Sequence, residues 1–147
     1  TSRKRRTQKQ KNMLDELKLN QACREIHKAA IEKGFEPQPV PTNLMLIVSE
    51  LGEACEADRK DEHADFSSYD FAYKQAMEDW DGTLHKEQTA FKEAFEASIK
   101  DTFEDEIADA FMRLMDLCGA LNIDIEQHIK MKAAYNKTRQ SKHGKRY

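Results

Sequence analysis

Apolar residues recur along the chain at the three- and four-residue intervals of amphipathic helices, and no run of alternating apolar and polar residues stands out. Glycine is scarce, and all three prolines fall within residues 37–41. The pattern therefore predicts an all-α protein. Its first helix should span residues 11–33, because an apolar stripe runs through this stretch and Gly34 is a natural residue to follow a helix end.

The proline-rich residues 37–41 predict an extended linker, followed by a second helix over residues 42–60. Residues 61–85 show the weakest periodicity, and a loop with short helical pieces is expected there. Helical pattern returns over residues 86–121, where Thr102 could cap a fresh start. Asp124 with Gln127 resembles a capping box that opens a last helix ending near Arg139. We expect a bundle of four to five main helices.

Charge is segregated along the chain. The formal net charge is only −3, yet thirteen of the 24 basic residues lie in residues 1–11 and 130–147, and all 27 acidic residues lie between them. An acidic body of this kind needs cations, a basic partner or its own basic ends. We expect one domain over residues 11–139, with basic tails over residues 1–10 and 140–147.

Composition excludes several classes of protein. No apolar run approaches the roughly 18 residues of a membrane span, so no membrane partner is expected. Three cysteines without a CxxC motif indicate reduced thiols and a cytoplasmic location. The basic ends could contact nucleic acid, but the acidic body makes nucleic acid the least favoured partner.

Two carboxylates stand out on the predicted second helix. Glu50 and Glu53 are three residues apart and therefore share a helix face. Glu50 has Leu46, Ile47 and Ala54 at helical spacing, and such an apolar surround requires a carboxylate to be protonated, paired or bound to a cation.

A second pair, Glu106 and Asp109, lies in a row of charged residues between two apolar patches of the same predicted helix. A helix that is apolar on two sides is enclosed, either in a bundle or between subunits, so this row should lie in an interior groove. The row consists of Asp105, Glu106, Asp109, Arg113 and Asp116. Six other acidic pairs share the three-residue spacing, so the apolar flanks, and not the spacing, single out these two.

The two pairs together predict a metal site. Two carboxylates about 6 Å apart repel by roughly 2–3 kcal/mol at an effective dielectric near 20, so four in one site require a cation. Oxygen ligands favour Mg²⁺, Mn²⁺ or Ca²⁺. A di-iron bundle is excluded because it needs Glu-x-x-His, which the sequence lacks. Cys23 and His27 are spaced for a metal but have no partners, which favours a core thiol and a surface histidine.

Basic residues mark the end of the last predicted helix. Lys132, Asn136 and Arg139 fall on one face, where they could bind phosphate or sugar groups. The alternative is a solvated helix end whose positive charges complement the helix dipole.

These motifs, in this order, resemble the MazG-like all-α nucleoside triphosphate pyrophosphohydrolases. Residues 44–57, which contain Glu50-x-x-Glu53, look like the first motif helix of that family. Residues 106–119, with Glu106-x-x-Asp109, look like the second. Residues 26–35 fit the family's first helix, and the ending with Lys132, Asn136, Arg139 and His143-Gly144-Lys145 is similar to phage and bacterial members.

The resemblance implies a function. The family's metal ligands correspond to Glu50, Glu53, Glu106 and Asp109, and Glu53 would also position or deprotonate the attacking water. With Mg²⁺, or Mn²⁺ in its place, attack at the α-phosphorus would give a nucleoside monophosphate and pyrophosphate. The substrate contacts would be Lys132, Asn136, Arg139 and Lys145.

The resemblance also implies an intertwined homodimer or homotetramer. In this chain the two metal motifs are separated by 52 residues, more than in compact members of the family. Residues 61–101 are therefore expected to be an insert or lid. The alternative function is a non-catalytic helical interaction module whose acidic groove binds a basic partner.

Overall fold

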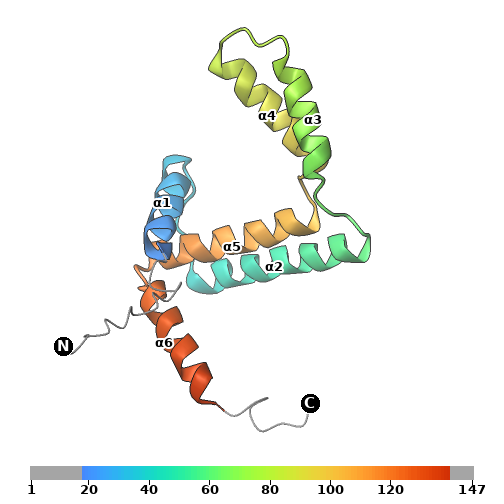
Figure 1. Ribbon diagram of the computed structural model, residues 1–147. Coiled ribbons are helices and arrows are strands. Elements are labelled where there is room, and N and C mark those ends of the chain that lie inside the picture. The colour runs from blue at the N-terminus through green and yellow to red at the C-terminus, as the bar shows by residue number, and fades with distance from the viewer. Residues whose placement is uncertain (1–17, 140–147) are drawn as a thin grey trace, which may run out of the picture.

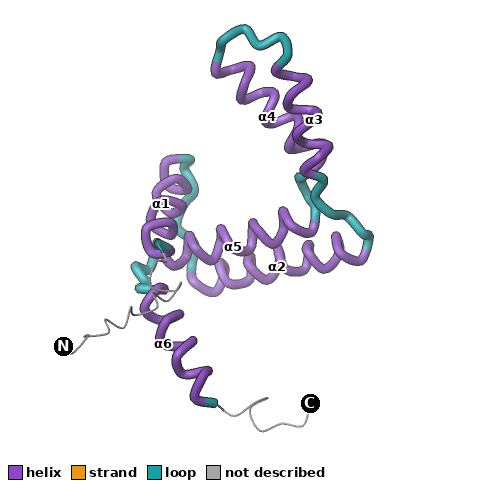
Figure 2. Tube along the Cα trace, viewed as in Figure 1, coloured by secondary structure: helices purple, strands orange, loops and turns teal. Residues whose placement is uncertain are grey.

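The computed structural model describes residues 18–139, and this part of the chain contains α-helices and no β-strand, which confirms the all-α prediction. It has six helices (Figure 1; Figure 2), one more than the upper expectation. They are α1 (Leu19–Glu32), α2 (Val40–Arg59), α3 (Phe66–Met77), α4 (Leu84–Ser98), α5 (Phe103–Ala120) and α6 (Ile125–Thr138).

The centre of the fold is the pair formed by α2 and α5, which lie antiparallel and side by side (Figure 1). The buried residues of α2 are Glu50, Ala54 and Ala57, and Ala110 is buried on α5. Small side chains let two helix backbones approach closely. The motifs that carry the candidate metal ligands are thereby brought together.

At the far end of α5, α1 packs closely against it (Figure 1). The backbone of Gly119 approaches α1 so closely that a Cβ there would lie 2.8 Å from the Cβ of His27 and still nearer the carbonyl oxygen of Cys23. Glycine is therefore required at this crossing of the helices.

The α3 and α4 helices pack on each other as a hairpin that projects from the other end of the α2/α5 pair (Figure 1; Figure 2). A loop with short helical pieces was expected over residues 61–85, but about half of this segment forms α3, a regular helix of 12 residues. Asp65 starts α3 by accepting a hydrogen bond from the amide of Ser68, and Thr83 caps α4 in the same way through Lys86. Apolar periodicity alone did not show α3, whereas it predicted a helix from residue 86, two residues after the start of α4.

The two connecting segments that join the hairpin to the α2/α5 pair are hydrogen-bonded to each other. The amide of Phe103 donates to the carbonyl of Glu62 at 2.9 Å, and the amide of Asp65 donates to the carbonyl of Ser98 at 3.0 Å. The hairpin is thus held at its base by paired backbone.

The last helix, α6, lies beyond the α1 end of the fold and extends away from the α2/α5 pair (Figure 1). The amide of Asn20 on α1 donates to Glu126 at 2.9 Å, and the Asn20 side chain donates to Asp124 at 2.7 Å. Asp124 also accepts from the amide of Gln127, as the expected cap requires. The predicted start of the last helix is confirmed.

Other helix limits differ from those expected. The predicted linker over residues 37–41 ends sooner, because α2 begins at Val40 and has Pro41 in its first turn. A proline is tolerated there because amides of the first turn have no partner within the helix. Lys18 precedes α1 with non-helical backbone angles. The expected earlier start of this helix at residue 11, and both basic tails, lie outside the described residues.

Few large side chains are buried. The most buried apolar residues are mainly alanine and cysteine, and within residues 18–139 no large side chain is fully enclosed. By contrast, the exposed fractions are 63% for Phe111, 44% for Leu114 and 64% for Met45. The sequence predicted that α5, which is apolar on two sides, would be enclosed. Within the described chain it is not enclosed. None of its helices is long and apolar enough to cross a membrane.

Candidate metal centre

Three of the four predicted metal ligands meet where α2 lies against α5. Glu50 comes from the middle of α2, and Glu106 and Asp109 come from successive turns at the beginning of α5. One carboxylate oxygen from each lies within 4.8 Å of the others. Residues 56 positions apart in the sequence thus form one cluster, which we call the carboxylate cluster.

Two members of the carboxylate cluster are buried, as the apolar flanks predicted. The exposed fraction is 7% for Glu50 and 5% for Glu106, whereas Asp109 is exposed. Within residues 18–139, no hydrogen bond or ion pair engages the carboxylate of Glu106, and no side-chain oxygen there is both fully buried and unpaired, so this carboxylate keeps some contact with solvent. An ionised carboxylate in such a largely buried place is unfavourable, so the position favours a proton or a cation.

The pKa values of Glu106 and Asp109 are both raised, as expected for carboxylates that are unfavourable in the ionised form. Burial, followed by the charges of Glu53, Glu50 and Asp109, raises the pKa of Glu106 to about 7. Burial also raises the pKa of Asp109, with Asp105 as the next cause. The cluster thus resists carrying its full negative charge when no cation is present.

Glu50 has a positively charged partner, the guanidinium of Arg113. The Nε of Arg113 donates to Oε1 of Glu50 in a short ion pair between α5 and α2. Arg113 follows Asp109 by four residues, so it lies on the same face of α5. The sequence placed Arg113 in the charged row but did not identify its role, because the spacing does not reveal which carboxylate on another helix it reaches.

Glu53, the fourth predicted ligand and the predicted catalytic residue, lies outside the group of three. It is exposed, and Ser49 donates to it at 3.4 Å. Its charge is nevertheless the second cause of the raised pKa of Glu106, which places its carboxylate near the cluster. Glu53 therefore stands at the rim, where it could reach a bound ion or a water beside one.

The chemistry of the donors fits a hard divalent cation. All contributors are carboxylates, and Mg²⁺, Mn²⁺ and Ca²⁺ prefer oxygen ligands. Mg²⁺ commonly takes only one or two carboxylates and keeps water or substrate oxygens in its other positions. One buried side and one exposed side suit such an ion, since Asp109 and Glu53 leave the cluster open to solvent.

The predicted substrate contacts on α6 are not brought to the carboxylate cluster within this chain. Lys132, Asn136 and Arg139 are exposed on a helix whose main contact is α1. Lys132 and Arg139 both lie over the ring of Tyr135, at 5.2 and 5.7 Å from its centre. Arg139 follows the end of α6 with extended backbone, and only Lys132 and Asn136 of the three lie within the helix. Lys145 lies outside the described residues.

Of the remaining residues of the charged row, Asp116 reaches another helix, whereas Asp105 accepts from the amide of Asp101 just before α5. Asp116 lies 2.8 Å from Nδ1 of His27 on α1, so this histidine is paired with a carboxylate and not with Cys23. The three cysteines are free, which agrees with reduced thiols. Members of the row thus reach α1 through Asp116 and α2 through Arg113, but Asp109 and Arg113 are exposed, so the row does not form an interior groove within the described chain.

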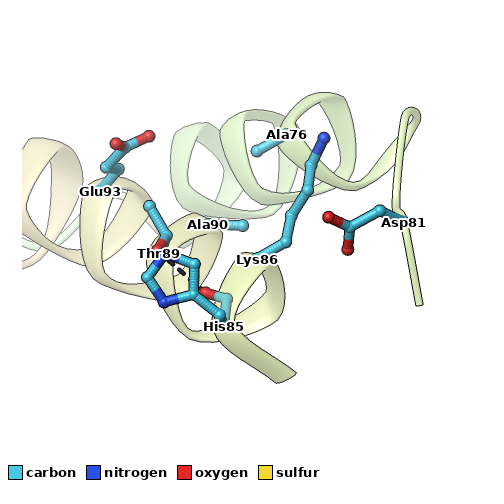
Figure 3. A pocket seen from close by; sticks show the side chains of 7 residues that line it. All are labelled: Ala76, Asp81, His85, Lys86, Thr89, Ala90 and Glu93. Carbon is cyan, nitrogen blue, oxygen red and sulfur yellow. Dashed lines mark hydrogen bonds between the residues drawn. The ribbon is translucent and has the colours of Figure 1, made fainter. Parts of the chain in front are cut away.

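A separate hollow lies on the α3/α4 hairpin (Figure 3). Its charged and polar lining includes Asp81, His85, Lys86 and Glu93. Figure 3 shows these side chains around an open depression between the two helices. Lys86 is engaged with the carbonyl of Asp79 at 2.7 Å, so the hollow presents no free cluster comparable with the carboxylates between α2 and α5.

Comparison with protein-family models, with curated protein sequences and with solved structures found no match for this chain. The interpretation of the site thus depends on its residues and their geometry.

Proposed function

We propose that this protein hydrolyses a nucleoside triphosphate, NTP or dNTP, to the nucleoside monophosphate and pyrophosphate in a Mg²⁺-dependent reaction. The observation that carries the proposal is the meeting of the largely buried Glu50 and Glu106 with Asp109, whose carboxylate oxygens lie within 4.8 Å of one another. This arrangement supports binding of a hard cation, and the motif resemblance assigns such a cation to triphosphate hydrolysis.

In the proposed reaction, Glu50, Glu106 and Asp109 hold the ion, with Glu53 at the rim. When bound, Mg²⁺, or Mn²⁺ in its place, neutralises phosphate charge and lowers the pKa of a coordinated water. Glu53 lies on the exposed side of the cluster, where its carboxylate can orient that water or accept its proton. Water then becomes part of the nucleoside monophosphate and pyrophosphate leaves.

The proposal includes self-association as a homodimer or homotetramer. Large apolar side chains of α2 and α5 are exposed, among them Met45, Phe111 and Leu114. A second copy that packs on these helices would remove such side chains from water. A second copy would also offer its own α6, whose Lys132 and Arg139 do not reach the cluster of their own chain.

Pyrophosphate release from a panel of NTPs and dNTPs, with and without Mg²⁺, tests the activity. We expect Asp109→Asn and Glu106→Gln to reduce the rate by at least about 100-fold, since each removes a metal ligand. Glu96→Gln, an exposed acid on α4, is the matched control and should retain the wild-type rate. An active wild type with unaffected ligand variants would refute the assigned site.

A second candidate is a non-catalytic interaction module, which the exposed apolar side chains of α2 and α5 favour. The two functions differ in their response to cations. An ion that binds only the folded state raises the melting temperature by mass action, and a module with an ion-free groove shows no such rise.

A further inference from the structure

Arg113 is, within residues 18–139, the basic side chain that pairs with the carboxylate cluster. The two partners of this ion pair differ in their surroundings. The side chain of Glu50 is 10% exposed and that of Arg113 is 46% exposed. The guanidinium therefore reaches inward from solvent to a buried carboxylate.

This asymmetry decides which partner can leave. If the pair opens, Arg113 can return to water at little cost, whereas Glu50 stays buried and needs another positive charge. The nearest alternative position for such a charge lies between Glu50, Glu106 and Asp109, whose oxygens are within 4.8 Å of one another.

A divalent cation in that position and a guanidinium on Glu50 would repel each other. Charges of +2 and +1 about 6 Å apart repel by roughly 3–6 kcal/mol at effective dielectrics of 20–40. The two cations thus compete for the same carboxylate, although they need not touch.

We infer that Arg113 is an exchangeable internal counter-ion, which neutralises Glu50 in the cation-free protein and withdraws into solvent when a divalent cation binds the cluster. This inference rests on the metal-binding part of the proposed function. It makes Arg113 a positioning residue that lowers cation affinity while it stabilises the cation-free fold.

The inference predicts opposite effects of one substitution. In Arg113→Gln, Glu50 loses its partner, so the cation-free protein becomes less stable. The same variant no longer opposes a divalent cation, so its affinity for the cation rises. A residue that only supports the fold would weaken both properties, because a less ordered cluster also binds ions less well.

Calorimetric titration with MnCl₂ tests the exchange, combined with melting temperatures in EDTA. We expect Arg113→Gln to bind Mn²⁺ about 3- to 10-fold more tightly than wild type and to melt several degrees lower in EDTA. Arg59→Gln is the matched control, since Arg59 also pairs with a glutamate, Glu56, but away from the cluster. It should leave both quantities unchanged.

An unchanged or weaker Mn²⁺ affinity in Arg113→Gln overturns the exchange while leaving the metal site intact. Absence of Mn²⁺ binding in both proteins overturns the metal site and the exchange together. The two failures are therefore distinguishable.

Wild-type protein provides a second measurement that does not depend on how the variant folds. The Nε–H signal of Arg113 in proton–nitrogen correlation spectra, assigned by its loss in Arg113→Lys, should move to the position of exposed arginines as Mg²⁺ is added. A signal that stays in place at saturating Mg²⁺ refutes the exchange.

Discussion

Gly119 on α5 lies against the backbone of Cys23 on α1. A Cβ at Gly119 would lie 2.8 Å from the Cβ of His27 and would also overlap the Cys23 carbonyl. The position of α1 on α5 thus depends on the absence of a side chain at one residue.

The first prediction is that Gly119→Ala destabilises the protein by about 2–4 kcal/mol, because the helices must separate or shift to admit the methyl group. Chemical denaturation with circular dichroism measures the change. Helix propensity alone would favour alanine, so the sign of the effect identifies its cause.

Gly52 provides the matched control for this prediction. It also lies inside a helix, but a Cβ there would meet nothing within 4 Å. Gly52→Ala should therefore stabilise the protein by about 0.5–1 kcal/mol. Equal effects of the two substitutions would show that the α1–α5 crossing is not as close as described.

The second prediction concerns the base of the α3/α4 hairpin. Glu104 lies 3.0 Å from Nδ1 of His63 and accepts from the amide of Ala64 at 2.8 Å. The hydrogen bond to Glu104 is the main cause that raises the pKa of His63 above its usual value, with the charges of Asp61 and Asp58 adding to it. A raised histidine pKa stabilises the fold below the unfolded pKa of about 6.5, and this is lost as pH rises through the folded value.

The substitution His63→Gln should consequently lower the melting temperature slightly at pH 5.5 and hardly at all at pH 8.5. Melting curves of wild type and variant at the two pH values give the comparison. His85→Gln, on the hairpin's own surface, serves as the control. A larger effect of His63→Gln at pH 8.5 would contradict the prediction.

How far the sequence predicted this arrangement depends on the kind of signal. The pairing of Glu50 with Glu106 and Asp109 was predictable, because carboxylates within apolar stripes are rare enough to be informative. The helix α3 was missed since its start depends on a local cap at Asp65 and its aromatic residues do not follow one stripe. Local capping is visible in a sequence only when the helix behind it is already suspected.

The Arg113–Glu50 pair shows a different limit. Spacing along α5 places Arg113 on the acidic face, but its partner Glu50 is 63 residues away in sequence, and their pairing depends on the register of two antiparallel helices. Likewise, nothing in the spacing of Lys132 and Arg139 indicates that α6 extends away from α2 and α5. Relations within a helix follow from periodicity, whereas relations between helices need the packing.

The third prediction tests self-association. Phe111 is 63% exposed on α5, and burial of such a side chain against a second copy would contribute about 2 kcal/mol. We expect wild type to elute as a dimer or larger species in size exclusion with light scattering, and Phe111→Glu to shift it towards monomer. Gln88→Glu adds the same charge to exposed α4 and should leave the mass unchanged. A monomeric wild type at micromolar concentration would contradict the prediction.

The fourth prediction concerns pH and the carboxylate cluster. Burial and the nearby charges of Glu53 and Glu50 raise the pKa of Glu106 to about 7, above its usual value of 4.5. A carboxyl group whose folded pKa is raised binds its proton more tightly in the folded state. The cation-free protein should therefore be most stable below about pH 4.5 with respect to this group, and lose stability as pH rises through 7.

Two treatments should remove this loss for different reasons. Glu106→Gln removes the charge, so in EDTA the variant should melt about 3 °C above wild type at pH 8 and close to it at pH 5. Saturating Mg²⁺ neutralises the charge, so it should raise the melting temperature of wild type at pH 8 and leave Glu106→Gln almost unchanged. The same burial that destabilises the cation-free protein is then what gives the cation its binding energy, and a wild type whose melting temperature in EDTA rises between pH 5 and 8 relative to Glu106→Gln would disprove this link.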